Sequence, residues 1–153
     1  MTTTQRAVFI LSFFCVTSVA MVYLFMQIGL VPYWQGLSGS EIQAWWAGPF
    51  RRFSLMMPLV HLGSIITTIA AFILLRRKDF FLWLIALLGL LVCQGFNFGV
   101  YGPNFNPALQ AGSLEDAAAL AAFGDWALYH GVRTAAALVS MVAMIIIFIR
   151  ARA

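Results

Sequence analysis

The chain has 153 residues, of which 63% are hydrophobic and only 9% are charged, and its formal net charge at pH 7 is +4. A soluble domain of this size could not bury so much apolar surface, so the composition excludes a soluble globular protein and is typical of a membrane protein. The basic residues fall in short groups between apolar runs and form no basic stripe, which argues against a nucleic-acid-binding protein.

Four apolar stretches are long enough to cross the roughly 30 Å hydrocarbon core of a bilayer, which takes about 20 helical residues. They cover approximately residues 7–30, 53–75, 80–100 and 126–149. A cleavable signal peptide is the competing interpretation of the first stretch, because residues 18–20 (SVA) resemble a cleavage site. The apolar run continues well past that point, so we expect a retained helix.

The segment between the first two spans is rich in Trp and Tyr, which prefer the membrane interface. Its section SEIQAWWAGPF predicts a short helix that lies on the membrane surface, with Ser40 as the N-cap. The second and third spans are joined by the minimal turn RRKD at 76–79, which makes them antiparallel neighbours.

The third span ends in CQGFNFG, where Gly95 and Gly99 would allow a helix or a flat ligand to approach Asn97 closely. A second long loop follows, opened by Gly and Pro residues. Within it, SLEDAAALAAFGDW predicts a helix that is capped by Ser113, has Asp116 at its third position, and can run on into the fourth span.

Basic residues set the orientation of the chain. With the N-terminus inside, the inner face carries six of them: Arg6, Arg76, Arg77, Lys78, Arg150 and Arg152. The outer face carries only Arg51 and Arg52, together with most of the acidic residues. The positive-inside rule therefore predicts cytoplasmic N- and C-termini, with the protein in a bacterial inner membrane. The predicted fold is an all-α membrane protein: a single-domain antiparallel four-helix transmembrane bundle over residues 1–153 with two structured extracytoplasmic loops.

The strongly polar residues inside the spans lie at similar depths in the predicted bundle. Measured from the inner end of each helix at 1.5 Å per residue, His61 and Gln94 lie roughly 21 Å up, Arg133 and Asn97 roughly 24–25 Å, and His130 roughly 28 Å. Ionisable residues in a span usually face the bundle interior. The shared depth therefore predicts one polar pocket, open to the outer side, between the second, third and fourth helices.

The fourth span begins with the stretch WALYHGVR, in which Trp126, His130 and Arg133 form one stripe of a helix. Aromatic residues, including Tyr101, are dense at this level, as in many small-molecule sites. Two simpler interpretations stay open. His130 and Arg133 could extend to the outer interface and anchor the helix, and His61 could hydrogen-bond a backbone carbonyl or Asn97.

The sequence lacks the residues that several kinds of functional site require. No carboxylate lies inside a span and no HExxH motif is present, so we predict no metal site. Cys15 and Cys93 form no CxxC pair, which argues against a thiol-disulfide enzyme. Haem b held by His61 and His130 is the one cofactor that the residue types allow, because the two histidines fall at similar depth on different helices.

The stretch at 126–133 resembles the anthrone oxygenase-like family, small four-span membrane proteins that in bacteria are largely catalogued as a domain of unknown function. Its members have an Asn-x-x-Leu element after the third span and a Trp-x-x-x-His-x-x-Arg element at the start of the fourth. This chain has NPAL at 106–109 and WALYHGVR at the matching separation, so the likeness covers chiefly residues 100–145.

The resemblance implies oxidation of an anthrone to an anthraquinone by O₂ without a cofactor. His130 would then be the base and Arg133 would stabilise the anion, together with Asn97 or Asn106. His61, Gln94, Tyr101 and Trp126 complete the predicted substrate-binding residues. The expected partners are a small hydrophobic molecule and the lipid bilayer. Two alternatives are a haem- or quinone-binding electron-transfer subunit and a non-catalytic subunit of a homo-oligomer or a larger membrane complex.

Overall fold

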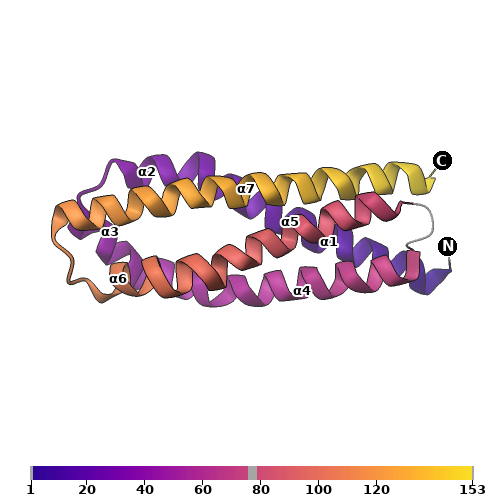
Figure 1. The fold of residues 1–153 in the computed structure, drawn as a ribbon, viewed down its shortest axis with the longest axis horizontal. Coiled ribbons are helices and arrows are strands. Elements are labelled where there is room, and N and C mark those ends of the chain that lie inside the picture. Colours follow the sequence, from indigo (N-terminus) through magenta and orange to yellow (C-terminus); the bar gives the residue numbers. More distant parts are fainter. Residues whose placement is uncertain (1, 76–78, 153) are drawn as a thin grey trace.

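A computed structural model describes residues 2–75 and 79–152, and this part of the chain contains helices and no strand. Figure 1 shows the helices in chain order: α1 (Thr3–Phe25), α2 (Val31–Gln35), α3 (Gly39–Trp45), α4 (Arg51–Leu75), α5 (Phe80–Phe96), α6 (Asn106–Ala111) and α7 (Asp116–Arg152). Three π-helical turns, Met26–Leu30, Trp46–Phe50 and Asn97–Phe105, join α1 to α2, α3 to α4 and α5 to α6.

Four continuous helical segments are long and apolar enough to cross a membrane: Thr3–Gln35, Gly39–Leu75, Phe80–Tyr101 and Asp116–Ala151. Each contains one of the four predicted spans. The chain is thus helical with four candidate membrane-spanning helices, as expected of an integral membrane protein. The predicted inner basic residues Arg76, Arg77 and Lys78 lie outside the described residues.

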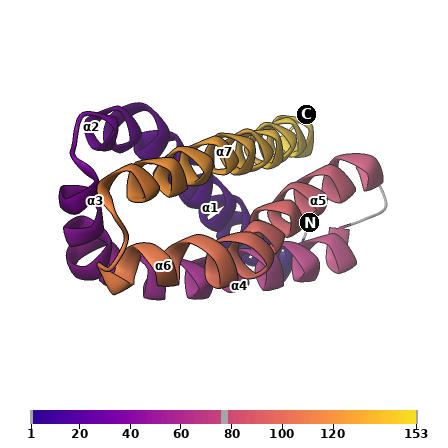
Figure 2. The same ribbon diagram turned by 60° about the vertical axis from the view of Figure 1, so that its left-hand side comes forward.

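The two ends of the bundle differ in structure. The start of α1, the end of α7 and the facing ends of α4 and α5 lie together at the right of Figure 1. At the opposite end, α2, α3 and α6 surround the start of α7, and Figure 2 shows them from a second direction. We call α2, α3, α6 and the first turns of α7 the cap.

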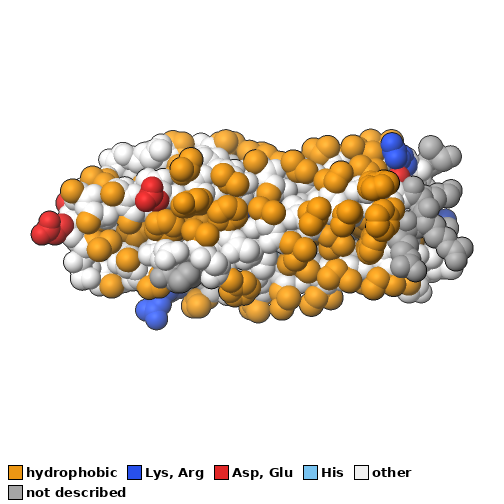
Figure 3. Space-filling model, in the orientation of Figure 1, with side chains coloured by type: hydrophobic (Ala, Val, Ile, Leu, Met, Phe, Trp, Pro, Cys, Tyr) orange, Lys and Arg blue, Asp and Glu red, His pale blue; other side chains and the backbone are white. Residues whose placement is uncertain are grey.

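The side chains on the outside of the bundle suit contact with lipid. In Figure 3 hydrophobic side chains run along the length of the molecule, and the visible charged side chains lie toward its two ends. Large apolar residues are strongly exposed on several helices, for example Phe14 on α1, Leu59 on α4, Phe81 on α5 and Leu128 on α7. Such a surface is stable in hydrocarbon and would aggregate in water.

The cap is more helical than its Gly and Pro residues predict. The third segment does not end near residue 100 but continues through the turn Asn97–Phe105 into α6, which begins with Pro107 in its first turn. Proline is tolerated there because the first amides of a helix need no intrahelical partner. The helix ends at Gly112, whose φ of 68° is left-handed and suits glycine. The predicted cap at Ser113 is wrong, because α7 begins at Asp116, but α7 does run unbroken through the fourth span.

The predicted surface helix of the first loop is α3, and its N-cap is Ser38 rather than Ser40. The Ser38 hydroxyl accepts a hydrogen bond from the Glu41 amide at 3.4 Å, while the Glu41 carboxylate accepts one from the Ser38 amide at 2.8 Å. This reciprocal pair is a capping box, and Glu41 lies at the right position to form it only with Ser38. A π-helical turn then joins α3 to α4, so the two form one segment.

Aromatic side chains fill the interior of the cap. Trp34 and Trp46 are fully buried, with ring centroids 5.1 Å apart, and both pack against Trp126 of α7. These two side chains are therefore held by protein contacts. They form the core of the cap and fix it to the start of the fourth span.

A single glutamine joins the two loops of the cap. The Gln43 side-chain amide donates a hydrogen bond to the Leu114 carbonyl at 3.0 Å and accepts one from the Leu114 amide at 2.9 Å. Nearby, the Ser40 amide donates to the Asp116 carboxylate at 2.9 Å. Gly39 lies so close to the Asp116 backbone that a Cβ atom there would collide with it.

Gln43→Ala should lower the free energy of unfolding by about 1–3 kcal/mol, because it leaves the amide and the carbonyl of Leu114 without their partner. The measurement is the thermal unfolding midpoint of the purified protein in detergent, followed by circular dichroism. Gln35→Ala is the matched control, since Gln35 is exposed at the end of α2. Equal midpoints for the two variants would contradict the role assigned to Gln43.

Candidate functional site

Arg133 lies deep in the bundle and is 6% exposed. Its guanidinium carbon is 4.2 Å from the ring centroid of Tyr23 on α1 and 4.4 Å from that of Tyr101. Two aromatic faces in cation–π contact hold the planar guanidinium in a fixed orientation. It also donates a hydrogen bond to the Asn97 side-chain carbonyl, and the Asn97 amide donates to Gln94 Oε1 at 3.2 Å.

No carboxylate in the described part of the chain forms an ion pair with Arg133; the ion pair seen there joins Arg150 to Asp79 at the other end of the bundle. Burying a guanidinium without a counter-ion is costly, and aromatic faces and one amide offset only part of that cost. An anionic or strongly electron-rich ligand would offset more of it. Arg133 therefore has the properties of an anion-binding group.

His130 is completely buried one helical turn before Arg133. Its Nδ1 donates a hydrogen bond of 2.9 Å to the carbonyl oxygen of Gln27, which can only accept, and the Thr134 hydroxyl lies 3.2 Å from the same nitrogen. With the proton on Nδ1, Nε2 is the basic atom of the neutral imidazole. Nε2 has no hydrogen-bond partner among the described residues. Gln27 thus orients His130 as a residue that could accept a proton.

His61 forms a hydrogen bond with Tyr23, and not with Asn97 or a backbone carbonyl as one interpretation of the sequence expected. Its Nε2 forms a short hydrogen bond with the Tyr23 hydroxyl. The Tyr23 ring lies 5.1 Å from the His61 ring and 5.4 Å from the His130 ring, measured between centroids. The space between the two imidazoles is therefore filled by tyrosine. Because two axial histidines of a haem must face a porphyrin lying between them, these residues do not fit haem b.

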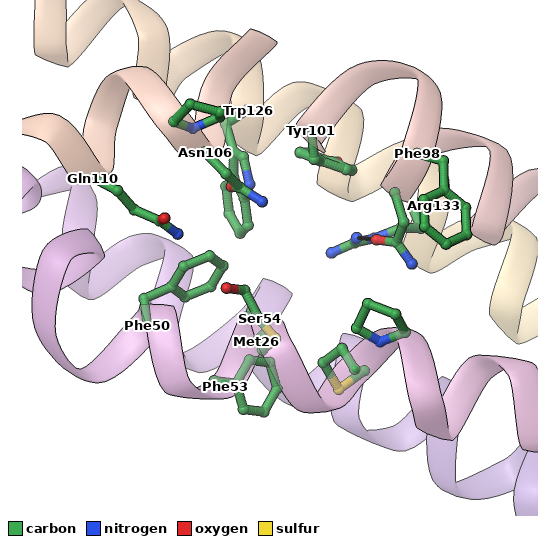
Figure 4. A pocket seen from close by; sticks show the side chains of 14 residues that line it. Met26, Phe50, Phe53, Ser54, Phe98, Tyr101, Asn106, Gln110, Trp126 and Arg133 are labelled. Atoms are coloured by element: carbon green, nitrogen blue, oxygen red, sulfur yellow. Dashed lines mark hydrogen bonds between the residues drawn. The ribbon is translucent and has the colours of Figure 1, made fainter. Parts of the chain in front are cut away.

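A cavity of about 320 Å³ lies beside Arg133, between α4 on one side and the turn Asn97–Phe105 with α6 on the other. Figure 4 shows Gln110 and Asn106 toward one end of this cavity and Arg133 toward the other, with Phe50, Phe53 and Ser54 on the facing helix. We call it the arginine pocket. Its volume falls within the range of small-molecule sites. Its lining includes Met26, Phe50, Phe53, Ser54, Met57, Pro58, Asn97, Phe98, Tyr101, Asn106, Pro107, Gln110, Trp126 and Arg133.

The structure divides the predicted site residues into two groups. Five of them line the arginine pocket: Asn97, Tyr101, Asn106, Trp126 and Arg133. The other three, His61, Gln94 and His130, do not line it. His130 packs against Trp126, with ring centroids 4.9 Å apart, and His61 packs against Tyr23, with ring centroids 5.1 Å apart.

Three of the lining residues carry buried polar atoms that have no hydrogen-bond partner in the described part of the protein. These atoms are the Tyr101 hydroxyl oxygen, Asn106 Oδ1 and Arg133 Nε. Unpaired buried polar atoms are rare and call for an explanation, such as a ligand or water that binds them. A ligand that presents one hydroxyl donor and one or two oxygen acceptors could satisfy all three.

Sequence reasoning missed Tyr23 and Ser54 and did not connect Gln27 to His130. A signal for the residues of α1 was present. Tyr23 and Gln27 lie one helical turn apart, roughly 24 and 30 Å above Ala7, at the same level as the other polar residues. Ser54 gave no such signal, since it lies just after two arginines at the start of a span.

Tyr23→Phe should lower the free energy of unfolding by about 1–3 kcal/mol, because the buried Nε2 of His61 loses its hydrogen-bond partner while the ring below Arg133 remains. A Tyr23→Phe, His61→Phe double variant should recover part of that loss, since no imidazole nitrogen is then left unpaired. The measurement is the thermal unfolding midpoint of the wild type, of the Tyr23→Phe and His61→Phe single variants, and of the double variant. A double variant less stable than either single variant would count against the pairing.

No cluster of three or more His, Cys, Asp or Glu side chains that could hold a metal ion occurs in the part of the chain that the structure describes. Comparison with protein-family models, with curated proteins and with solved structures finds no match to this chain. The case for a function therefore rests on the arginine pocket and its residues.

Proposed function

We propose that this protein is an enzyme of the cytoplasmic membrane that oxidises a flat, hydrophobic phenolic, anthrone- or quinone-like molecule with O₂ and no cofactor. The proposed enzyme is an antiparallel four-helix transmembrane bundle with both termini in the cytoplasm and the cap outside. One observation carries the proposal: Arg133, which has no carboxylate partner among the described residues, lines a pocket beside two polar atoms that are also unpaired there. The resemblance of residues 126–133 to the anthrone oxygenase-like family supports it.

The polar atoms of the pocket match an oxygenated aromatic ring. Arg133 would stabilise an oxyanion, Tyr101 would donate to a second oxygen, and Asn106 Oδ1 would accept from a phenolic hydroxyl. Aromatic and apolar residues, among them Phe50, Phe53 and Trp126, would pack against the faces of the ring. Stabilising the anion of the substrate lowers the barrier to removing its proton, which is the first chemical step.

The reaction balances without another reactant. An anthrone loses a proton to His130 Nε2, and the resulting electron-rich anion reduces O₂ and forms a carbon–oxygen bond. The peroxide anion that results takes up a proton to become a hydroperoxide, which then loses water and leaves the quinone carbonyl. One oxygen atom enters the product and the other leaves as water. Because His130 does not line the pocket and packs against Trp126, which does, the proposal requires the indole to move aside when substrate binds.

Oxygen uptake by the purified protein in lipid nanodiscs, with anthrone as the probe, tests the proposal. We expect protein-dependent consumption of one O₂ per anthraquinone formed, with anthraquinone followed by its absorbance. His130→Ala and Arg133→Ala should abolish this activity while their thermal unfolding remains cooperative. Wild-type activity in both variants, or no oxidation above the spontaneous rate, would contradict the proposal. Anthrone binding without oxygen uptake would instead favour a quinone-binding subunit.

A further inference from the structure

A second cavity, of about 360 Å³, lies on the other side of the start of α4. It is enclosed by α1 and α2, with the turn between them, and by the end of the α3–α4 turn. Its lining is wholly apolar or aromatic: Val22, Phe25, Met26, Leu30, Trp34, Trp45, Pro49, Phe50 and Phe53. We call it the apolar pocket. The indole N–H groups of Trp34 and Trp45 are the only polar side-chain atoms of this lining, and the lining carries no charged group, so the pocket suits hydrocarbon.

The two pockets share a wall. Met26, Phe50 and Phe53 line both the arginine pocket and the apolar pocket. Met26 comes from the π-helical turn after α1, and its unbranched side chain can adopt several rotamers at little cost. A chain that starts beside Arg133 would therefore reach the apolar pocket by displacing side chains of this shared wall, of which Met26 is the most adaptable.

The apolar pocket also reaches the outside of the bundle. Phe25, which lines it, is 61% exposed on the surface of α1, where the surrounding side chains are suited to lipid. Val22 lies one turn earlier and lines the same cavity. A hydrocarbon chain in the apolar pocket could thus extend past Phe25 into the bilayer without crossing a polar region.

We infer that the ligand is amphipathic, with a flat oxygenated ring in the arginine pocket and an alkyl or isoprenoid tail that passes Met26 into the apolar pocket. This inference rests on the proposed function, because it takes the ring at Arg133 as its starting point. It deepens that proposal by naming the substrate class: membrane-resident ring compounds with a long apolar substituent, and not free tricyclic molecules. The two cavities together provide space for both parts of such a molecule.

Photo-cross-linking in nanodiscs tests where the tail lies. The probe is 2-naphthol that carries an octyl chain ending in an aliphatic diazirine, and the same chain without the ring reports ordinary contact with lipid. Labelled residues are mapped by mass spectrometry. We expect the ring-bearing probe to label residues 22–34 and 45–53 selectively, and an excess of untailed 2-naphthol to suppress that labelling.

Val22→Phe fills the apolar pocket and should lower labelling of these segments by about tenfold, the effect expected of an overpacking cost of about 1.4 kcal/mol. Leu30 lies in the π-helical turn after α1 and lines the same pocket. Leu30→Phe therefore repeats the test if Val22→Phe fails to fold. Val139→Phe is the matched control, because Val139 lines an apolar surface hollow on α7 that is separate from both pockets. Unfolding midpoints establish that all three variants are folded.

The possible failures are distinguishable. If the ring-bearing probe labels only the lipid-facing residues that the ring-free chain also labels, and does so equally in Val22→Phe, the tail lies in the bilayer and the inference is wrong. Binding of untailed 2-naphthol, followed by its fluorescence, can still depend on Arg133 in that case, and the proposed function then stands. If untailed 2-naphthol shows no Arg133-dependent binding, the proposed function and the inference fail together.

Discussion

Arg133→Met should lower the rate of anthrone oxidation by about 100- to 1000-fold, the effect usually seen when one donor to a developing oxyanion is removed. Methionine is unbranched and apolar, so it can replace the stem of Arg133, although it is shorter and does not carry a planar group between Tyr23 and Tyr101. The variant loses the charge and the donors and keeps most of the packing. Its unfolding midpoint should therefore equal or exceed that of the wild type, since an uncompensated buried charge is removed.

Arg150→Met is the control, because Arg150 is also an arginine of α7 but is paired with Asp79 in an exposed position. Loss of an exposed ion pair costs little, and we expect unchanged oxidation. Arg133→Lys should be intermediate: the charge stays, but the planar contact with two aromatic faces is lost. If Arg133→Met keeps the wild-type rate, Arg133 does not stabilise a substrate anion, and its role is limited to packing.

Gly89→Val should cause the largest loss of stability among the predicted variants, about 3 kcal/mol or complete failure to fold. Gly89 is where α5 packs against α7 at closest approach. A Cβ atom at this position would collide with the Ser140 hydroxyl and would lie 2.6 Å from the backbone oxygen of Ala136. The Ser140 hydroxyl itself donates to the Ala86 carbonyl at 2.9 Å, which fixes the distance between the two helices.

Fluorescence-detected gel filtration after heating measures this effect in detergent. Gly95→Ala on the same helix is the control, because a Cβ atom at Gly95 meets nothing within 4 Å, and we expect no loss. The Gly89→Ala single variant should also be destabilised. Adding Ser140→Ala to it should recover only part of the lost stability, since the Ala136 backbone oxygen remains close to the new Cβ atom. Full recovery would show that the serine side chain alone sets the helix separation.

Much of the helical architecture could be predicted because the bilayer imposes it. An apolar run of about 20 residues has few alternatives to a helix, so the four spans follow from composition. The common depth of His61, Asn97, His130 and Arg133 also follows from helix geometry alone. No helix packs closely at Gly95 or Gly99 in the described structure, and the close helix contact is at Gly89 instead. The approach of a flat ligand to Asn97 beside these glycines stays a prediction.

The cap could not be predicted, because its conformation depends on tertiary contacts. The N-cap of α3 is an exception, because the spacing of Ser38 and Glu41 is a capping-box signature that is visible in the sequence. Trp34 looks like an interface anchor until Trp46 and Trp126 are brought beside it. The sequence also could not predict which side of α7 faces the pocket. Helical spacing places His130 and Arg133 on one stripe, yet of these two only Arg133 lines the pocket.

The bond between Gln43 and Leu114 has a consequence for the order of folding, since 71 residues of sequence separate its two partners. The first three helical segments can enter the membrane while α3 still lacks the chain that it binds. Contacts of this range form late, because the closure of a long loop must precede them. The cap therefore closes only after α7 has reached its place, and the arginine pocket, which takes Trp126 and Arg133 from α7, is completed in the same late step. A chain that stops before α7 would leave Trp34 and Trp46 uncovered, a ready target for quality-control proteases.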